Sequence, residues 1–156
     1  FPSPAQHLSP NGFAAVIKNN LIGTFHVTRE VATRSMIPRQ GGRIVNVIAN
    51  ILRGFPGMAH TGAARAGVEN LTMSLAVEWS QFGILVNAVA PGIIKTDFAR
   101  ALWEDTETLK PRLATTPMRR IGEPDEIGGI VAFLASKAAS YMTGAVIVAD
   151  GGVTIA

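Results

Sequence analysis

The chain has 156 residues and a formal net charge of +3; 47% of its residues are hydrophobic and 16% are charged. This balance is sufficient to bury a core and argues against an intrinsically disordered chain. There is no cysteine, which excludes a disulfide scaffold and thiolate chemistry.

The same composition limits the partners. The basic residues are scattered, and the one tight pair, Arg119-Arg120, is too small for a nucleic-acid footprint. No apolar run reaches the ~20 residues of a bilayer span. We therefore expect a small-molecule substrate, no nucleic acid, no membrane and no metal. With no cysteine and no visible export signal, the expected location is cytoplasmic.

Hydrophobic periodicity and turn residues predict six main elements in the order helix, strand, helix, strand, helix, strand. The first helix begins at Ser9-Pro10 and ends before Pro38. The other main elements, in chain order, are a strand at 43–48, a helix at 61–81 ended by Gly83, a strand at 84–90, a helix opened by Glu123-Pro124, and a strand at 145–149. A polar, mobile loop at 97–116 is expected to contain one further short helix.

Apolar strands that alternate with helices predict an α/β fold with a parallel sheet covered on both faces. Covered parallel sheets usually hold ~5–6 strands, and no strand is predicted before the first one here. We therefore expect residues 1–156 to be a single partial domain, the C-terminal half of a Rossmann-like doubly wound sheet. No Gly-rich turn follows a strand and opens a helix, so either the chain binds no dinucleotide or that loop lies upstream.

Five motifs, in this order and spacing, resemble the C-terminal part of the short-chain dehydrogenase/reductase family. They are NLIGTF at 20–25, GRIVNV at 42–47, NAVAPG at 87–92, RIGEP at 120–124, and Thr143-Gly144 through Asp150-Gly151-Gly152. The resemblance covers nearly the whole chain. It implies an NAD(P)-dependent oxidoreductase that assembles as a homo-oligomer, a dimer or a tetramer.

The family's catalytic positions are largely replaced in this chain. The resemblance places Thr61 where the family has Tyr, Arg65 where it has Lys, and Ala49 where it has Ser; Asn20 alone matches. Threonine is a much poorer acid than a phenol, and arginine cannot pass on a proton. His60, which exchanges a proton near neutral pH, is a further candidate donor.

Each of these residues also has a structural alternative. Thr61 is either a donor to the substrate carbonyl or the N-cap of its helix. His60 is either the proton donor or a loop residue that caps or packs. Arg65 is either a ligand of the nicotinamide ribose or a solvated helix charge. Asn20 interrupts an apolar stripe and is expected to hold a water at the active site.

The stretches 54–56 and 60–68 resemble the branch that contains peroxisomal trans-2-enoyl-CoA reductase and 2,4-dienoyl-CoA reductase. This implies NADPH-dependent reduction of the α,β-double bond of an acyl-CoA thioester. NADH stays open, because the residues that select the 2′-phosphate are expected upstream. A dehydrogenase of alcohols or aldehydes, and a non-catalytic truncated chain that acts through its interfaces, remain alternatives.

Cofactor contacts are predicted just beyond the second strand, where open α/β sheets bind ligands. By resemblance, Pro91 and Gly92 pack on the nicotinamide, the Ile94 backbone bonds its carboxamide, and Thr96 reaches the carboxamide or the pyrophosphate. The alternative is a simple strand-ending turn. Residues 97–116 are expected to form the substrate lid.

Overall fold

The computed structural model describes residues 1–97 and 99–156, without the side chain of Thr108. The predicted alternation of helices and strands is confirmed. The elements are α1 (Pro10–Ile17), α2 (Gly23–Val31), β1 (Gly42–Val47), α3 (Ala59–Trp79), β2 (Ile84–Pro91), α4 (Arg100–Trp103), α5 (Thr106–Thr115), α6 (Pro124–Ala135) and β3 (Val146–Ala149).

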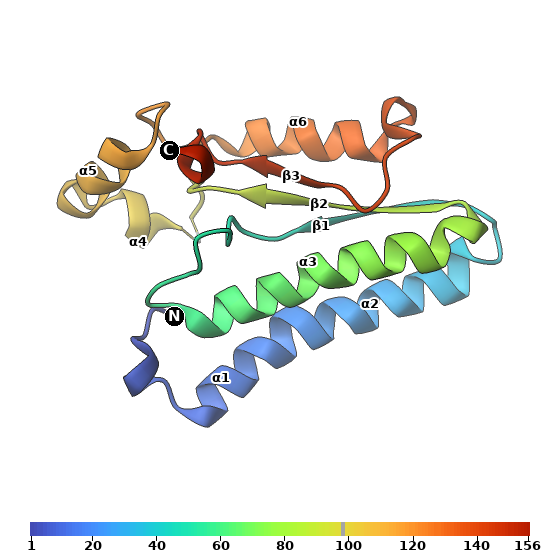
Figure 1. Ribbon diagram of the computed structural model, residues 1–156, viewed down its shortest axis with the longest axis horizontal. Coiled ribbons are helices and arrows are strands. Elements are labelled where there is room, and N and C mark those ends of the chain that lie inside the picture. Colours follow the sequence, from blue (N-terminus) through green and yellow to red (C-terminus); the bar gives the residue numbers. More distant parts are fainter. Residues whose placement is uncertain (98) are drawn as a thin grey trace.

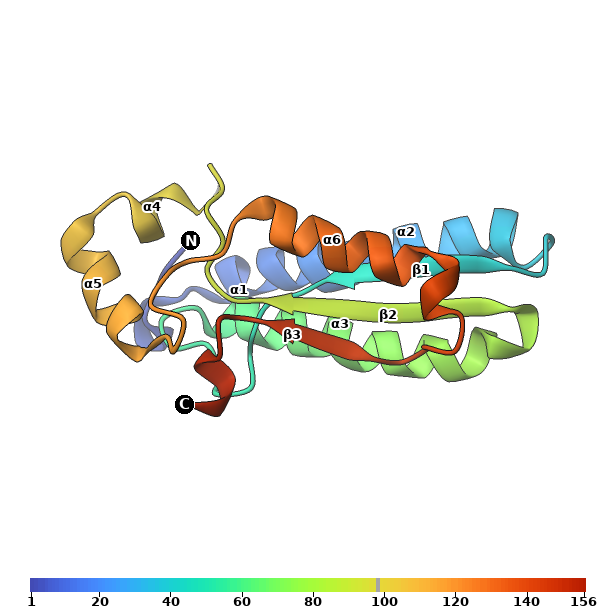
Figure 2. The same cartoon turned by 90° about the horizontal axis from the view of Figure 1, so that it is seen from above.

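The three strands form a parallel sheet in the order β1-β2-β3. Helices α1, α2 and α3 cover one face and α6 covers the other, while α4 and α5 lie beyond the carboxyl ends of the strands (Figures 1 and 2). The strands are uniform apolar runs because both faces of the sheet are covered. The α/β, Rossmann-like fold class is confirmed.

The first helix is a continuous rod with two wider turns in it. A π-helical turn at Lys18–Ile22 separates α1 from α2, and a second one at Ala32–Met36 follows α2. Such turns often occur at functional sites. The first of them contains Asn20.

The prediction for residues 97–116 was wrong in one respect, because this segment holds two helices, α4 and α5, rather than one. The backbone N–H of Glu107 donates to the Asp105 carboxylate over 3.2 Å at the start of α5. Most of α5 is exposed, so it carries no apolar stripe by which the sequence could reveal it. The predicted lid also contains Phe98, which lies outside the described residues.

The core consists of two apolar layers, one on each face of the sheet. On one face, α3 residues Val68 and Leu75 are buried against β2 residues such as Val86 and Ala88. On the other face, Leu134 of α6 is buried against Val89. The central strand β2 thus contributes buried residues to both layers.

Helix α3 approaches the first helix very closely. A Cβ at Gly67 would lie 2.7 Å from Leu21 Cδ2, so only glycine fits here without a shift. Helix α3 is also tied to β1 by a buried polar pair, in which Asn46 Nδ2 donates to Thr72 Oγ1 over 2.9 Å. The Thr72 hydroxyl in turn donates to the Val68 carbonyl over 2.8 Å. Together these contacts set the position of α3 on the sheet.

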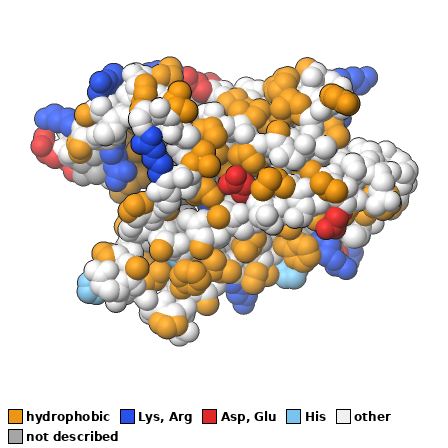
Figure 3. Space-filling model, in the orientation of Figure 1, with side chains coloured by type: hydrophobic (Ala, Val, Ile, Leu, Met, Phe, Trp, Pro, Cys, Tyr) orange, Lys and Arg blue, Asp and Glu red, His pale blue; other side chains and the backbone are white. Residues whose placement is uncertain are grey.

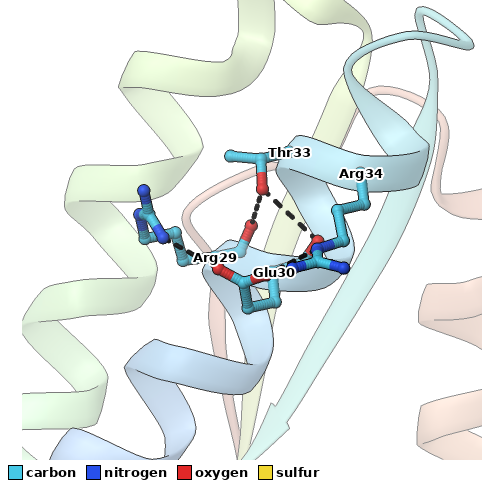
Figure 4. A network of polar contacts seen from close by, with 4 residues as sticks. All are labelled: Arg29, Glu30, Thr33 and Arg34. Atoms are coloured by element: carbon cyan, nitrogen blue, oxygen red, sulfur yellow. Dashed lines mark hydrogen bonds and ion pairs between the residues drawn. The ribbon is translucent and has the colours of Figure 1, made fainter.

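A polar network lies on the exposed side of α2 and the turn after it (Figure 4). The Glu30 carboxylate accepts from Arg29 over 2.8 Å and from Arg34 over 2.7 Å. The Thr33 hydroxyl donates to the Arg29 carbonyl over 2.9 Å. These charges are largely exposed, and exposed ion pairs typically contribute only about 0–1 kcal/mol to stability.

Candidate active site

A large hollow lies at the carboxyl ends of the strands. This main cavity has a volume of about 990 Å³ and is mostly apolar. The ends of all three strands contribute to its walls, with Ala49 and Asn50, Pro91 and Gly92, and Ala149 and Asp150. The remaining wall residues come from the α4–α5 region, from α6 and from the C-terminal segment, and they include Ala99, Leu102, Arg112, Leu113, Ile127, Ile130, Val153, Thr154 and Ile155. An open parallel α/β sheet binds its ligands at this place.

Three of the five predicted cofactor residues line the main cavity, namely Pro91, Gly92 and Ile94, whereas Arg65 and Thr96 do not belong to its described lining. A Cβ at Gly92 would lie 2.8 Å from Asp150 Cα, so the backbones of β2 and of the turn after β3 touch here. Ile94 is held by a bridge to Gly122, whose carbonyl accepts from the Lys95 N–H over 2.9 Å. The segment after β2 is therefore a fixed wall rather than a loose turn.

Thr96 uses its polar groups next to the main cavity rather than in its described wall. Its hydroxyl accepts from the Ala99 N–H over 3.2 Å, and its carbonyl accepts from Trp103 Nε1 over 3.0 Å. In this arrangement Thr96 holds the start of the α4 region.

Ala49, at the family's serine position, contributes only a methyl group to the wall of the main cavity. The chain's single tyrosine, Tyr141, is fully exposed and lies between α6 and β3, near the amino end of the strands. No tyrosine is therefore present in the described lining. The hydroxyls in that lining come from threonines.

The first turn of α3 holds His60 and Thr61. His60 is completely buried. Its Nδ1 accepts from the Thr61 N–H over 2.8 Å and lies 3.3 Å from Thr61 Oγ1. Its Nε2 is buried with no hydrogen-bond partner in the described structure. The ring of Phe1 stands edge-on to the imidazole, with centroids 4.8 Å apart.

One structural alternative for this turn was wrong, and the other was wrong in part. Thr61 is not the N-cap, because α3 begins at Ala59 and Met58 occupies the cap position without a side-chain bond. His60 lies within α3 rather than in a loop, but it does pack, since it is buried against the ring of Phe1. Neither residue belongs to the described lining of the main cavity. They instead form a polar pair two and three residues after Met58, which does line the cavity.

Arg65 is half-buried, and its Nη1 donates to the Val47 carbonyl over 3.0 Å. The next N–H, that of Ile48, donates to Val89 on β2, so the Val47 carbonyl points to the outer edge of β1. Desolvation by burial lowers the pKa of Arg65. The guanidinium is therefore tied to the edge of β1 and is not a freely solvated helix charge.

Asn20 uses its side chain within its own helix, where Nδ2 donates to the Val16 carbonyl over 3.1 Å. Its carbonyl accepts from the Thr24 hydroxyl over 2.7 Å. The structure therefore brings Pro91, Gly92 and Ile94 together in the main cavity, whereas Asn20, His60, Thr61 and Arg65 lie outside its described lining.

The sequence analysis missed the link between Asn50 and Asp150. Asn50 Nδ2 donates to Asp150 Oδ2 over 2.7 Å across the floor of the main cavity. The same carboxylate accepts from Thr154 and from the Gly152 N–H. Burial pushes the pKa of Asp150 upward, but these hydrogen bonds outweigh it and hold the pKa below its ordinary value. The available signal was a polar residue shortly after each of two strands, Asn50 three residues after β1 and Asp150 directly after β3.

Comparison with known proteins agrees with this geometry. A family model described as enoyl-(acyl carrier protein) reductase matches residues 2–154. The chain is 43% identical over 155 residues to the "probable 2,4-dienoyl-CoA reductase" of Bacillus subtilis, covering 97% of this chain and 61% of that protein. The chain belongs to the short-chain dehydrogenase/reductase family.

Solved structures of the short-chain dehydrogenase/reductase family share the fold. A gluconate 5-dehydrogenase from Burkholderia cenocepacia, in complex with NADP and tartrate, matches all of this chain and 61% of its own, with a TM-score of 0.95 and 34% identity. A citronellol catabolism dehydrogenase of Pseudomonas aeruginosa matches 98% of this chain and 59% of its own, with a TM-score of 0.85 and 41% identity. The chain thus spans about three fifths of these relatives.

Two other kinds of site are absent from the described residues. Within the described ranges, no helix combines the length and the apolarity needed to cross a bilayer. The described residues also contain no group of three or more histidine, aspartate or glutamate side chains placed to hold a metal ion.

Proposed function

We propose that the protein containing this chain is an NADPH-dependent reductase of the α,β-double bond of enoyl-CoA thioesters. The observation that carries the proposal is the wall of the main cavity, which offers the methyl group of Ala49 and, in its described lining, no tyrosine. Carbonyl reduction relies on a strong proton donor to the substrate oxygen. Reduction of a conjugated double bond instead needs hydrogen-bond donors to the thioester carbonyl, because charge develops there.

The wall formed by Pro91, Gly92 and Ile94 fits a flat nicotinamide ring. The missing Cβ of Gly92 lets the chain after β2 lie directly against the backbone of Asp150, and the bridge to Gly122 keeps Ile94 in place. Bound NADPH would supply the hydride. NADH is kept as an alternative, because the residues that would select the 2′-phosphate are expected upstream.

The polar groups beside the main cavity have proposed roles as well. Arg65 would hold the nicotinamide ribose from the edge of β1. Thr61 and His60, which share the contact at Nδ1, would donate toward the thioester carbonyl or its water. Asn20 would hold a water in the π-helical turn. Thr96 would reach the carboxamide or the pyrophosphate through its hydroxyl proton, because the hydroxyl only accepts from Ala99 while the N–H and the carbonyl of Thr96 are both engaged.

We also propose that residues 1–156 form the C-terminal part of a larger domain, with 97–116 as its substrate lid. The support is that the relatives are longer and that β1 has an outer edge, at which Val47 is 48% exposed. A further parallel strand against that edge would complete the sheet. It would also bring the nucleotide-binding half toward the main cavity.

A homo-oligomer, dimer or tetramer, is part of the proposal. Large apolar side chains are exposed along α1, α2 and α3, among them Phe13, Val27, Val31 and Val77. Hydrophobic side chains gather over the lower helices in Figure 3. Apolar patches of this kind mark interfaces between proteins, and sedimentation of the full-length protein would report the assembly.

The decisive experiment follows NADPH oxidation by the full-length protein with a medium-chain trans-2-enoyl-CoA. Turnover with formation of the saturated acyl-CoA is expected. NADPH binding without turnover would contradict the proposal. A parallel assay of alcohols and aldehydes with NADP⁺ serves as the comparison.

The alternative function is an NAD(P)-dependent dehydrogenase of alcohols or aldehydes. Its support is the likeness to the citronellol catabolism dehydrogenase and to the gluconate 5-dehydrogenase. Turnover of an alcohol together with no reaction of enoyl-CoA would favour it. Inactivity toward all of these substrates would favour a non-catalytic chain that acts through its interfaces.

A further inference from the structure

A second hollow adjoins the main cavity. This outer groove has a volume of about 670 Å³ and is lined by Lys95, Trp103, Leu109, Arg120, Ile121, Glu123 and Glu126. Arg120, Ile121 and Glu126 also line the main cavity. These three residues therefore form the boundary between the two hollows, and a long ligand that leaves the main cavity here would enter the outer groove.

The boundary is an ion pair near the surface. Arg120 donates to the two carboxylate oxygens of Glu126 over 2.8 and 2.6 Å, and both side chains are nearly half exposed. Exposed pairs contribute little to stability. A ligand can therefore displace this pair, or lie beside it, at a small cost to the fold.

The outer groove combines a fixed aromatic face with a cation. The Trp103 indole is oriented by its hydrogen bond to the Thr96 carbonyl over 3.0 Å. Lys95 Nζ lies 5.8 Å from the centre of that ring, and no described carboxylate pairs with it. Leu109 and Ile121 add apolar surface. Such a groove suits a chain of neutral amide and methylene groups that ends in an anion.

The surroundings of the outer groove are basic. Residues 95–120 contain six lysines and arginines against four aspartates and glutamates. Lys and Arg side chains gather over the α4–α5 region in Figure 3. A positive surface of this kind raises the local concentration of anionic ligands.

We propose that the outer groove binds the phosphopantetheine arm of the thioester substrate, with the arm's phosphate at Lys95 and its chain against Trp103. This rests on the proposed function, since the enoyl end of the substrate would then lie in the main cavity. The arm would pass the Arg120–Glu126 pair. Phosphopantetheine is common to coenzyme A and to acyl carrier proteins, so the assignment concerns this shared group.

The test compares enoyl thioesters of one acyl chain, attached to coenzyme A, phosphopantetheine, pantetheine or N-acetylcysteamine, with the full-length protein. A charge-assisted contact is worth about a tenfold change in kcat/KM. Lys95→Met should therefore lower kcat/KM about tenfold for the two thioesters that carry the phosphate and leave the other two unchanged. Trp103→Leu should lower kcat/KM for every substrate except the N-acetylcysteamine thioester.

Lys137→Met, at the opposite end of α6, is the matched control and should change none of these values. An equal loss across all four thioesters, or no loss in Lys95→Met, would overturn the proposal. An acyl-carrier-protein thioester, run beside the coenzyme A thioester, identifies the source of the arm. The thioester with the higher kcat/KM should lose activity in Lys95→Met. If neither thioester depends on Lys95, the assignment is overturned.

A binding measurement separates this proposal from the proposed reaction. Free phosphopantetheine should quench the fluorescence of Trp103 in the wild type, and Trp103→Phe identifies that signal against the buried Trp79. Lys95→Met should raise the midpoint of the quench about tenfold. Quenching without enoyl turnover would contradict only the reaction, whereas turnover without quenching would contradict only the groove.

Discussion

The side-chain amide of Asn50 donates to the carboxylate of Asp150 over 2.7 Å, joining residues one hundred positions apart in the sequence. The bond ties the segment after β1 to the turn after β3. Both residues lie in the wall of the main cavity. A polar contact to an ionised group therefore joins two parts of the wall of the candidate active site.

Replacing Asn50 by alanine should lower the free energy of unfolding by about 1–2 kcal/mol, because a hydrogen bond to a charged group is lost. Urea unfolding of the full-length protein measures this. Asn70→Ala on the exposed face of α3 is the control and should change stability by less than about 0.5 kcal/mol. Equal effects of the two substitutions would contradict the assigned role of Asn50.

The same contact predicts a pH dependence. The pKa of Asp150 is held below its ordinary value of about 3.9, so the folded protein binds this proton less readily than the unfolded chain. The stabilisation from Asp150 is therefore complete above about pH 4 and is lost as pH falls through the folded-state pKa. Asp150→Asn should flatten this part of the stability–pH curve, and an unchanged curve would argue against it.

The ion pair at the boundary of the outer groove should persist in mild acid. Its hydrogen bond from Arg120 is the main reason that the pKa of Glu126 is lowered to about 2. Any stabilisation from Glu126 is present above the unfolded-state value and is lost as pH falls toward 2. An NMR titration of the Glu126 carboxyl should give a midpoint near 2, and Arg120→Met should move it toward the ordinary value. A wild-type midpoint near 4 would mean that the pair does not form.

Gly67→Ala should destabilise the protein by about 1–3 kcal/mol, because the new methyl group would lie 2.7 Å from Leu21. Gly128 in α6 offers the opposite case, since nothing lies within 4 Å of a Cβ there. Gly128→Ala should raise stability by about 0.5–1 kcal/mol through helix propensity. Thermal unfolding of both variants tests the pair, and a neutral Gly67→Ala would show that the two helices can separate freely.

The buried Asn46–Thr72 pair and the exposed Glu30 network should respond very differently. Thr72→Val removes the acceptor of a buried amide and should cost about 1–3 kcal/mol, whereas Glu30→Gln should change stability by less than about 1 kcal/mol. The double variant Asn46→Val/Thr72→Val should cost less than the sum of the single changes, because no buried amide is left unpaired. Chemical unfolding measures all four proteins, and additivity would argue against the bond.

The strands and the helices that cover them could be predicted because they depend on local pattern. Continuous apolar runs mark β1 and β2, and Gly83 ends the helix before β2 with a positive φ. The same patterns predict only one helix at 97–116 instead of α4 and α5, because α5 is mostly exposed and has no apolar stripe. The placement of Thr61 as an N-cap failed because a helix can start one turn earlier without any side-chain cap, as α3 does at Ala59.

Residues of the candidate site could be predicted only where they directly follow the carboxyl end of a strand. Pro91, Gly92 and Ile94 were located because ligands bind beyond the carboxyl end of a parallel strand. The partner of Asn50 could not be found from spacing, since a contact across one hundred residues depends on the register of the whole sheet. The burial of His60 is likewise a tertiary property, decided by Phe1 and by its place in the first turn of α3.

Helices α4 and α5 wall the main cavity, yet every buried hydrophobic core residue in the described structure lies outside them. Substitutions between residues 99 and 115 can therefore alter what the cavity accepts while leaving the foundation of the fold intact. Exchanging this segment for that of a relative is therefore expected to change which substrates the cavity accepts without unfolding the sheet and its covering helices.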